Sequence, residues 1–295
     1  MHGATARIGW RDSRHTSVQF EAAAAFLPEP LGTLNAVSVS CPKARIETGS
    51  VHCQHAEIRA RSDRFGPQAI TAGFDYTVAT GRLAFRLDGV RFAGGGLSAS
   101  GVVEAPAWDV RLHGEDLQLE ALPGALSAVG VVLPGLEGSG LLDVTSRLSG
   151  AASGFAGGHL MVRLAAEAFS DGTGALAGEN LGLQLEGDIA RLAEGWKVSA
   201  ELESIRGQFY AEPVFLDLDV QPVHAKAALE WQPEHGRLLV KSLEYHQRET
   251  MALQLSGSLR PGQPVPVDSL QVSVKAGRFP ALYDTWLQPW LNETL

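Results

Sequence analysis

Basic residues are scarce in this sequence. Lys and Arg together number 24 against 33 Asp and Glu, so the formal net charge is −9 and the pI is about 5.5. Nucleic-acid phosphates and anionic membrane surfaces are bound by clustered Lys and Arg, whereas the basic residues here are scattered singly. We therefore expect no nucleic-acid partner and no polybasic attachment to a membrane.

Long apolar runs are also missing. No stretch of 18 apolar residues occurs, so we expect no transmembrane helix in this sequence. The start, MHGATARIGWRDS, lacks the charged and then apolar layout of a signal peptide, and the end, WLQPWLNETL, stops within its pattern. The alternatives are a cytosolic protein or a segment of a longer chain, and we favour the segment.

Cysteine is limited to Cys41 and Cys53, which lie on either side of a predicted turn. They are either two free thiols or a disulfide formed in an oxidising compartment, and we predict the disulfide. His52 and His55 suggest a zinc site, but strand alternation places His52 on the opposite face from Cys53 and His55. We expect no metal site and no cofactor.

Catalytic motifs are absent as well. There is no G-x-S-x-G elbow, no G-K-[ST] phosphate loop and no H-x-x-x-H pair, and the glycines of DGTGALAG do not have dinucleotide-binding spacing. Asp217 and Asp219 share a strand face, as paired glycosidase acids do, but such a pair is usually the solvated face of a strand. We expect no enzyme activity.

What the sequence does contain is glycine, at 33 residues, and alternation of apolar and polar residues along most of its length. Short connections rich in Gly, Pro, Asp or Asn favour antiparallel pairing of about fifteen strands of six to nine residues each. The expected class is all-β with a few short helices. The clearest alternating runs lie at 81–92, 96–105, 108–120, 139–150, 158–168, 180–189, 195–205, 212–220, 224–231, 236–246, 251–259 and 268–277.

Two stretches have helical spacing and resemble each other at an offset near 157 residues. Each opens on Pro after a large apolar residue and has a second Pro about ten residues later. We interpret them as an internal repeat in which short helices separate long runs of strands. The predicted organisation is a first β-groove segment (1–118), a helical segment (119–138), a second β-groove segment (139–277) and a second helical segment (278–295). In the last, the apolar stripe Phe279, Leu282, Trp286 and Trp290 should pack against the open end of the preceding sheet, where the edge strand lies near 268–276.

Two short helices cannot cover the apolar face of so large a sheet. A sandwich or a barrel would cover it, but the number of strands and the repeat favour a curled sheet with an elongated hydrophobic groove. Such a groove would suit acyl chains. Strict alternation predicts the groove-lining residues Val110, Leu112, Leu160, Val162, Leu183, Leu185, Val198, Leu202, Leu216, Leu218, Leu253, Leu255, Val272 and Val274.

The segment LEALPGALSAVGVVLPGLEGSGLLDVTSRLSG (119–150) resembles a pattern that recurs in the AsmA-like superfamily. In this pattern a short helix is followed by a glycine, an apolar–Asp strand and a Leu-x-Gly ending. FSDGTGALAGENLGLQLEGDI (169–189) and the run after it resemble long periplasmic members of the YdbH and TamB type. The resemblance covers most of residues 30–295. It implies a repeating β-groove protein of the Gram-negative envelope that is anchored in the inner membrane and moves phospholipid towards the outer membrane. This sequence departs from that group in its short length and in having no N-terminal anchor.

The sequence thus leads to hypotheses of different classes. The first is a periplasmic β-groove segment that conducts phospholipid without catalysis, its membrane partners lying outside this chain. The second is a structural or assembly module of the envelope or of a secretion system, whose apolar face packs on protein. A β-sandwich carbohydrate-binding domain is a third. Bound phospholipid would separate the first from the others.

Overall fold

The computed structural model describes residues 2–12, 15–26, 32–128, 130–132, 135, 137–152, 154–261, 266–289 and 291. Most of these residues are in strands, and helix is confined to short pieces. The expected all-β class with a few short helices is therefore confirmed.

The strands follow one another along the chain with short connections, because turn-forming glycines punctuate the alternating runs. Their bounds are β1 His2–Asp12, β2 His15–Phe26, β3 Thr33–Glu47, β4 Ser50–Ser62, β5 Gly66–Thr77, β6 Arg82–Phe92, β7 Gly95–Glu104, β8 Ala107–Gln118, β9 Glu137–Ala151, β10 Gly154–Ser170, β11 Leu176–Leu192, β12 Gly195–Ala211, β13 Val214–Asp217, β14 Val223–Gln232, β15 Arg237–Gln247, β16 Met251–Leu259 and β17 Val267–Ala276. The helical pieces are α1 Leu122–Ala128, η1 Pro233–His235, α2 Phe279–Leu282 and the π-helical turn η2 Tyr283–Leu287.

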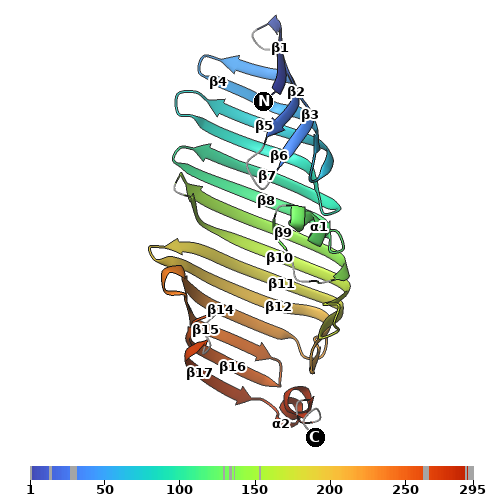
Figure 1. The fold of residues 1–295 in the computed structure, drawn as a ribbon, viewed down its shortest axis with the longest axis vertical. Coiled ribbons are helices and arrows are strands. Elements are labelled where there is room, and N and C mark those ends of the chain that lie inside the picture. Colours follow the sequence, from blue (N-terminus) through green and yellow to red (C-terminus); the bar gives the residue numbers. More distant parts are fainter. Residues whose placement is uncertain are drawn as a thin grey trace. The chain divides into compact units, whose positions relative to one another are not determined.

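Pairing is antiparallel between strands that are neighbours in the sequence. It runs without a break from β1 to β8, and again from β10 through β12 and from β14 to β17. The short strand β13 pairs with one end of β12, and β14 pairs with the other end. Figure 1 shows this meander within β4 to β8 and within β10 to β12, where the curved strands lie side by side in chain order. The predicted antiparallel connections are confirmed.

Two compact units divide the chain. The first comprises residues 1–133 and 145–155, and the second comprises 134–144 and 156–295. The division falls within β9 and not before it, so this strand contributes residues to both units. Each unit is an antiparallel sheet followed by a short helix, α1 in the first unit and α2 in the second.

The two helices have the spacing that the repeat predicts. Helix α2 begins 157 residues after α1, Phe279 against Leu122, and a proline is the second residue of each. Proline suits the first turn of a helix because its missing N–H would have no partner there. Both helices fall within the segments expected to be helical, 119–138 and 278–295.

The strands of the second unit are longer than expected. Strands β10, β11 and β12 each have 17 residues, whereas runs of six to nine residues were predicted. The register between β11 and β12 shifts between two pairs, Glu179 with Gln208 and Gly182 with Arg206. Asn180, within this shift, has a φ of 50°. Such a bulge reverses the phase of alternation without ending the strand. Sequence alternation therefore stops at about 180 and 205, although both strands continue.

Candidate functional site: the apolar face

Residues directly opposite each other in an antiparallel pair lie on the same face of the sheet. In the second unit this register aligns apolar residues into a row that crosses seven strands, from β10 to β17. The first row consists of Val162, Leu185, Leu202, Ala225, Tyr245, Leu253 and Val274. The sheet therefore gathers on one line residues that are up to 112 positions apart in the sequence.

Two further rows run beside the first on the same face. One consists of Leu160, Gly187, Ala200, Ala227, Leu243, Leu255 and Val272, and the other of Gly158, Ile189, Val198, Leu229, Val240, Gly257 and Leu270. None of these side chains is charged at neutral pH. With strands about 4.8 Å apart and rows about 6.6 Å apart, the three rows cover roughly 400 Å². Contiguous apolar surface of this size commonly marks a binding site.

Much of this face is open to solvent. Leu160 is 40% exposed, Val272 48% and Val274 54%, and Leu185 and Leu202 are half-buried. Val240 is an exception, at 6%. These residues form a lined surface and not the closed interior of a sandwich.

Leu216 and Leu218 differ from the other predicted lining residues. They are 8% and 4% exposed, and Leu216 lies opposite Phe209 in the pairing of β12 with β13. Phe209 in turn lies 6.2 Å from Phe169, measured between ring centroids. The two leucines are thus buried where β13 lies, unlike the half-buried and exposed residues of the three rows. Alternation predicts which face of the sheet a residue is on, but it does not predict whether another segment of the chain buries that residue.

The helical segment after β17 covers the first row at Tyr245, the fifth of its seven residues. Trp286 in η2 packs edge-on against Tyr245 with the ring centroids 6.0 Å apart, and its indole Nε1 donates a hydrogen bond to Gln247 Oε1 at 2.8 Å. Gln247 is fully buried, and its Nε2 donates to Gln221 Oε1 at 2.7 Å. Burial raises the pKa of Tyr245 well above its usual value. The hydrogen bonds among Trp286, Gln247 and Gln221 therefore hold η2 in place over the apolar row.

The predicted stripe packs elsewhere than expected. Trp286 contacts β15, not the edge strand β17, and Phe279 is 65% exposed. Leu282 is half-buried, and Trp290 lies outside the described residues. In the pairing of the described residues, β17 joins β16 alone.

The opposite face of the second unit is polar. His224 Nε2 lies 2.7 Å from Glu201 Oε1, Lys226 Nζ lies 3.2 Å from the same oxygen, and His159 Nδ1 lies 3.0 Å from Asp188 Oδ1. The hydrogen bond from His224, with Lys226, lowers the pKa of Glu201. Shallow hollows on this face, one of about 310 Å³, are lined by small and charged residues of β11, β12, β14 and β15. Exposed ion pairs of this kind contribute little stability, and the face is a solvated surface.

The paired acids on β13 and in the turn after it have structural roles. Asp217 Oδ1 accepts hydrogen bonds from the backbone N–H groups of Asp219 and Val220, and Asp219 Oδ1 accepts one from Gly207 N. Both carboxylates therefore hold the turn after β13. Within the described ranges, no group of three or more His, Cys, Asp and Glu side chains is placed to hold a metal ion.

The first unit carries a matching apolar face. Val110 aligns through Gly101, Phe85 and Phe74 with Cys53, and Leu112 aligns in the neighbouring row. The second of these rows consists of Leu112, Ala99, Leu87, Ala72 and Ala56. Both predicted lining residues of this unit thus lie on one apolar face and are half-buried.

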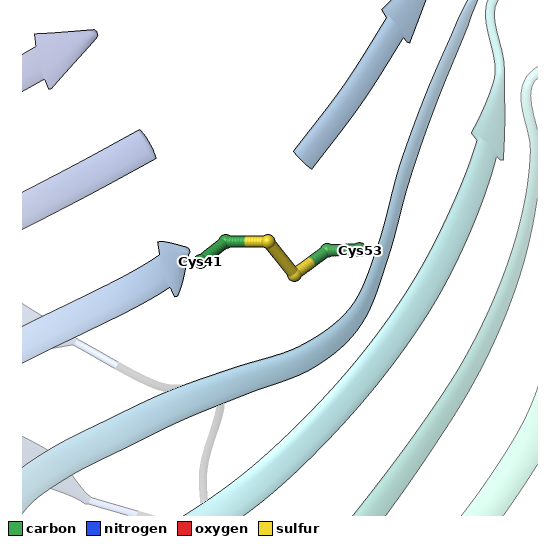
Figure 2. Close-up of a disulfide and its surroundings, with 2 residues drawn as sticks. All are labelled: Cys41 and Cys53. Atoms are coloured by element: carbon green, nitrogen blue, oxygen red, sulfur yellow. A yellow bond between two sulfur atoms is a disulfide. The ribbon is translucent and has the colours of Figure 1, made fainter. Parts of the chain in front are cut away.

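Cys41 and Cys53 form the predicted disulfide, which joins the neighbouring strands β3 and β4 (Figure 2). Their Cα atoms are 6.3 Å apart, and the side chains belong to a buried cluster with Ala44, Ala56 and Ala72. The crosslink therefore pins the sheet of the first unit at its apolar face.

His52 and His55 take no part in the cluster around the disulfide. His52 Nδ1 lies 3.1 Å from Asp75 Oδ2 on the polar face. A register shift between Cys53 and Ala56 reverses the alternation, so Ala56 is buried and His55 is exposed. The expectation that His55 shares a face with Cys53 is wrong. Strict alternation assumes a regular strand, and the extra residue of a β-bulge moves the residues after it to the other face.

Comparison with known proteins gives no relatives: no family model, no curated protein and no solved structure matches this chain. None of the helices in the described part of the chain has the length and hydrophobicity needed to span a bilayer.

Proposed function

We propose that this chain binds phospholipid acyl chains along the apolar face of its sheet, as a non-catalytic segment of a periplasmic lipid-conducting protein. The observation that carries the proposal is the row that begins at Val162 and ends at Val274, which has no charged residue across seven strands and six consecutive pairings and is partly open to solvent. The parallel rows beside it widen the strip to dimensions that suit an extended hydrocarbon chain.

The energetics support a lipid ligand. Covering roughly 400 Å² of apolar surface contributes about 10 kcal/mol at ~25 cal/mol per Å², before the cost of ordering the lipid. A hydrocarbon chain needs no directional partner, and the three rows provide no charged group that would have to lose its hydration. Fluid chains can therefore occupy the face and move along it with little specificity.

The disulfide and the resemblance to the AsmA-like superfamily support the location. A buried disulfide persists in an oxidising compartment such as the periplasm. The proposal that lipid moves between the inner and outer membranes rests on the resemblance, and the face of the sheet supplies the physical means.

Lipid analysis of the purified chain tests the proposal. The chain is purified in a mild detergent from a Gram-negative host, and co-purified lipids are extracted and quantified by mass spectrometry. We expect phospholipid at a reproducible ratio to protein, at least one molecule per chain. Protein that is folded and monomeric but free of lipid would contradict the proposal. A protein bound in place of lipid would favour the assembly-module hypothesis.

A further inference from the structure

A hollow of about 640 Å³ lies in the first unit beneath α1. The lining comes from the turn between β4 and β5, from the end of β6 with the turn into β7, and from the start of the α1 segment. The residues concerned are Arg64, Phe65, Arg91, Phe92, Gly94 and Ala125, with their immediate neighbours. These three segments meet because β5, β6 and β7 are neighbours in the sheet and α1 follows β8 directly.

One side of the hollow is aromatic and continues onto the apolar face. The rings of Phe65 and Phe92 lie 5.7 Å apart. Phe92 follows Val90 at a spacing of two on β6, and Val90 lies opposite Leu97. Leu97 shares the face of Ala99, which lies opposite Leu112 in the predicted lining. An acyl chain that enters beside the two rings would thus reach the apolar rows of this unit.

Two arginines, Arg64 and Arg91, are among the residues that line the hollow. Arg64 Nη1 donates a hydrogen bond to the carbonyl oxygen of Ala128 at 2.5 Å, which fixes the end of α1 above the turn. The backbone of Arg91 is held on both sides by the buried Gln68, whose Oε1 accepts from Arg91 N and whose Nε2 donates to Arg91 O. No described residue pairs with the guanidinium of Arg91, which is exposed. One cationic group is therefore positioned by its backbone and available to a ligand.

We infer that this hollow holds the phosphate of an anionic phospholipid headgroup, with the acyl chains directed past Phe92 onto the apolar face. The inference rests on the proposed function and adds a headgroup preference to it. Guanidinium groups recognise phosphate through charge-assisted hydrogen bonds, and adjacent aromatic rings suit the start of an acyl chain. The chain as a whole has a net charge of −9, so a preference for anionic lipid must come from a local site.

The test measures lipid uptake from vesicles by the full chain. Vesicles contain phosphatidylcholine with 20% phosphatidylglycerol, and the lipid bound after re-isolation of the protein is quantified by mass spectrometry. The variants are Arg91→Gln, Arg91→Lys and the control Arg59→Gln, which removes an exposed arginine that pairs with Glu57 away from the hollow. A separate arm adds inorganic phosphate at matched ionic strength.

We expect the wild type to enrich phosphatidylglycerol over the vesicle composition. Arg91→Gln should reduce this enrichment by roughly threefold to tenfold, because the variant loses one exposed charge-assisted hydrogen bond to the phosphate. Arg91→Lys should keep part of the enrichment, Arg59→Gln all of it, and uptake of phosphatidylcholine should not change. Inorganic phosphate should not compete, because the acyl chains supply most of the affinity.

Distinct results would overturn the inference. Equal uptake of both lipids by the wild type, or an equal effect of Arg59→Gln and Arg91→Gln, would remove the headgroup site and leave the proposed function standing. Competition by inorganic phosphate would identify a site for the free anion in place of the lipid. Uptake of neither lipid would contradict the proposed function and this inference together.

Discussion

Replacement of Leu185 by aspartate separates an open apolar face from a closed core. Leu185 lies between Val162 and Leu202 in the first row and is half-buried. Loss of about half the transfer free energy of a leucine, with its cross-strand contacts, amounts to about 2 kcal/mol. In a closed core the unpaired carboxylate would add a penalty of several kcal/mol. On an open face it stays hydrated, so the sheet should still fold.

The measurements are thermal unfolding and lipid uptake on the same samples. For a unit of this size we expect the melting temperature to fall by roughly 4–8 °C, at about 2–4 °C per kcal/mol. Lipid uptake should fall by about tenfold, because a charge beneath an acyl chain costs on the order of 1.4 kcal/mol or more.

Gln184→Asp is the matched control, since Gln184 is the next residue on the polar face, opposite Arg163 and Glu203. This variant should change stability by less than about 0.5 kcal/mol and leave lipid uptake intact. An unfolded Leu185→Asp chain beside a folded Leu185→Ala chain would refute the open face, as would unchanged lipid uptake in Leu185→Asp.

Three further changes probe the parts that hold the face in place. Replacing both Cys41 and Cys53 with alanine should lower the unfolding free energy of the first unit by about 3 kcal/mol in the chain-entropy model, as read from denaturant unfolding. Trp286→Phe removes the hydrogen bond to Gln247 and should cost about 1–2 kcal/mol, with faster amide exchange across 279–287 and no loss of lipid uptake. Asn180→Val should be about 1–2 kcal/mol less stable than Asn180→Gly, because φ at this bulge is 50°; equal stability would mean that the bulge relaxes.

The sequence carried enough information to predict the strands and their faces. Apolar and polar residues alternate because each strand has one face towards water, and the register then places Leu185, Leu202 and Leu253 on one line as the alternation requires. The two helices were predictable from their prolines and from the 157-residue offset. The disulfide followed from two cysteines placed across a turn.

Alternation could not predict where bulges occur, nor which residues are buried by segments distant in the sequence. The bulge near Asn180 and the one after Cys53 each add a residue that reverses the phase, so strand ends and the side of His55 were predicted wrongly. The burial of Leu216 depends on contacts between β12 and β13, and the contact of Trp286 with Tyr245 joins residues 41 positions apart. The pairing of α1 with Arg64 likewise has no signal in local sequence.

Site-specific photo-crosslinking to lipid tests the central claim most directly. Benzoylphenylalanine replaces either Leu202 in the first row or its neighbour Glu203 on the polar face, and the chain is illuminated in the presence of phospholipid vesicles. We expect phospholipid adducts at position 202 in several-fold excess over position 203, because successive residues of a strand face opposite sides. Equal labelling at the two positions, an excess at 203, or adducts to protein alone at 202 would contradict the central claim.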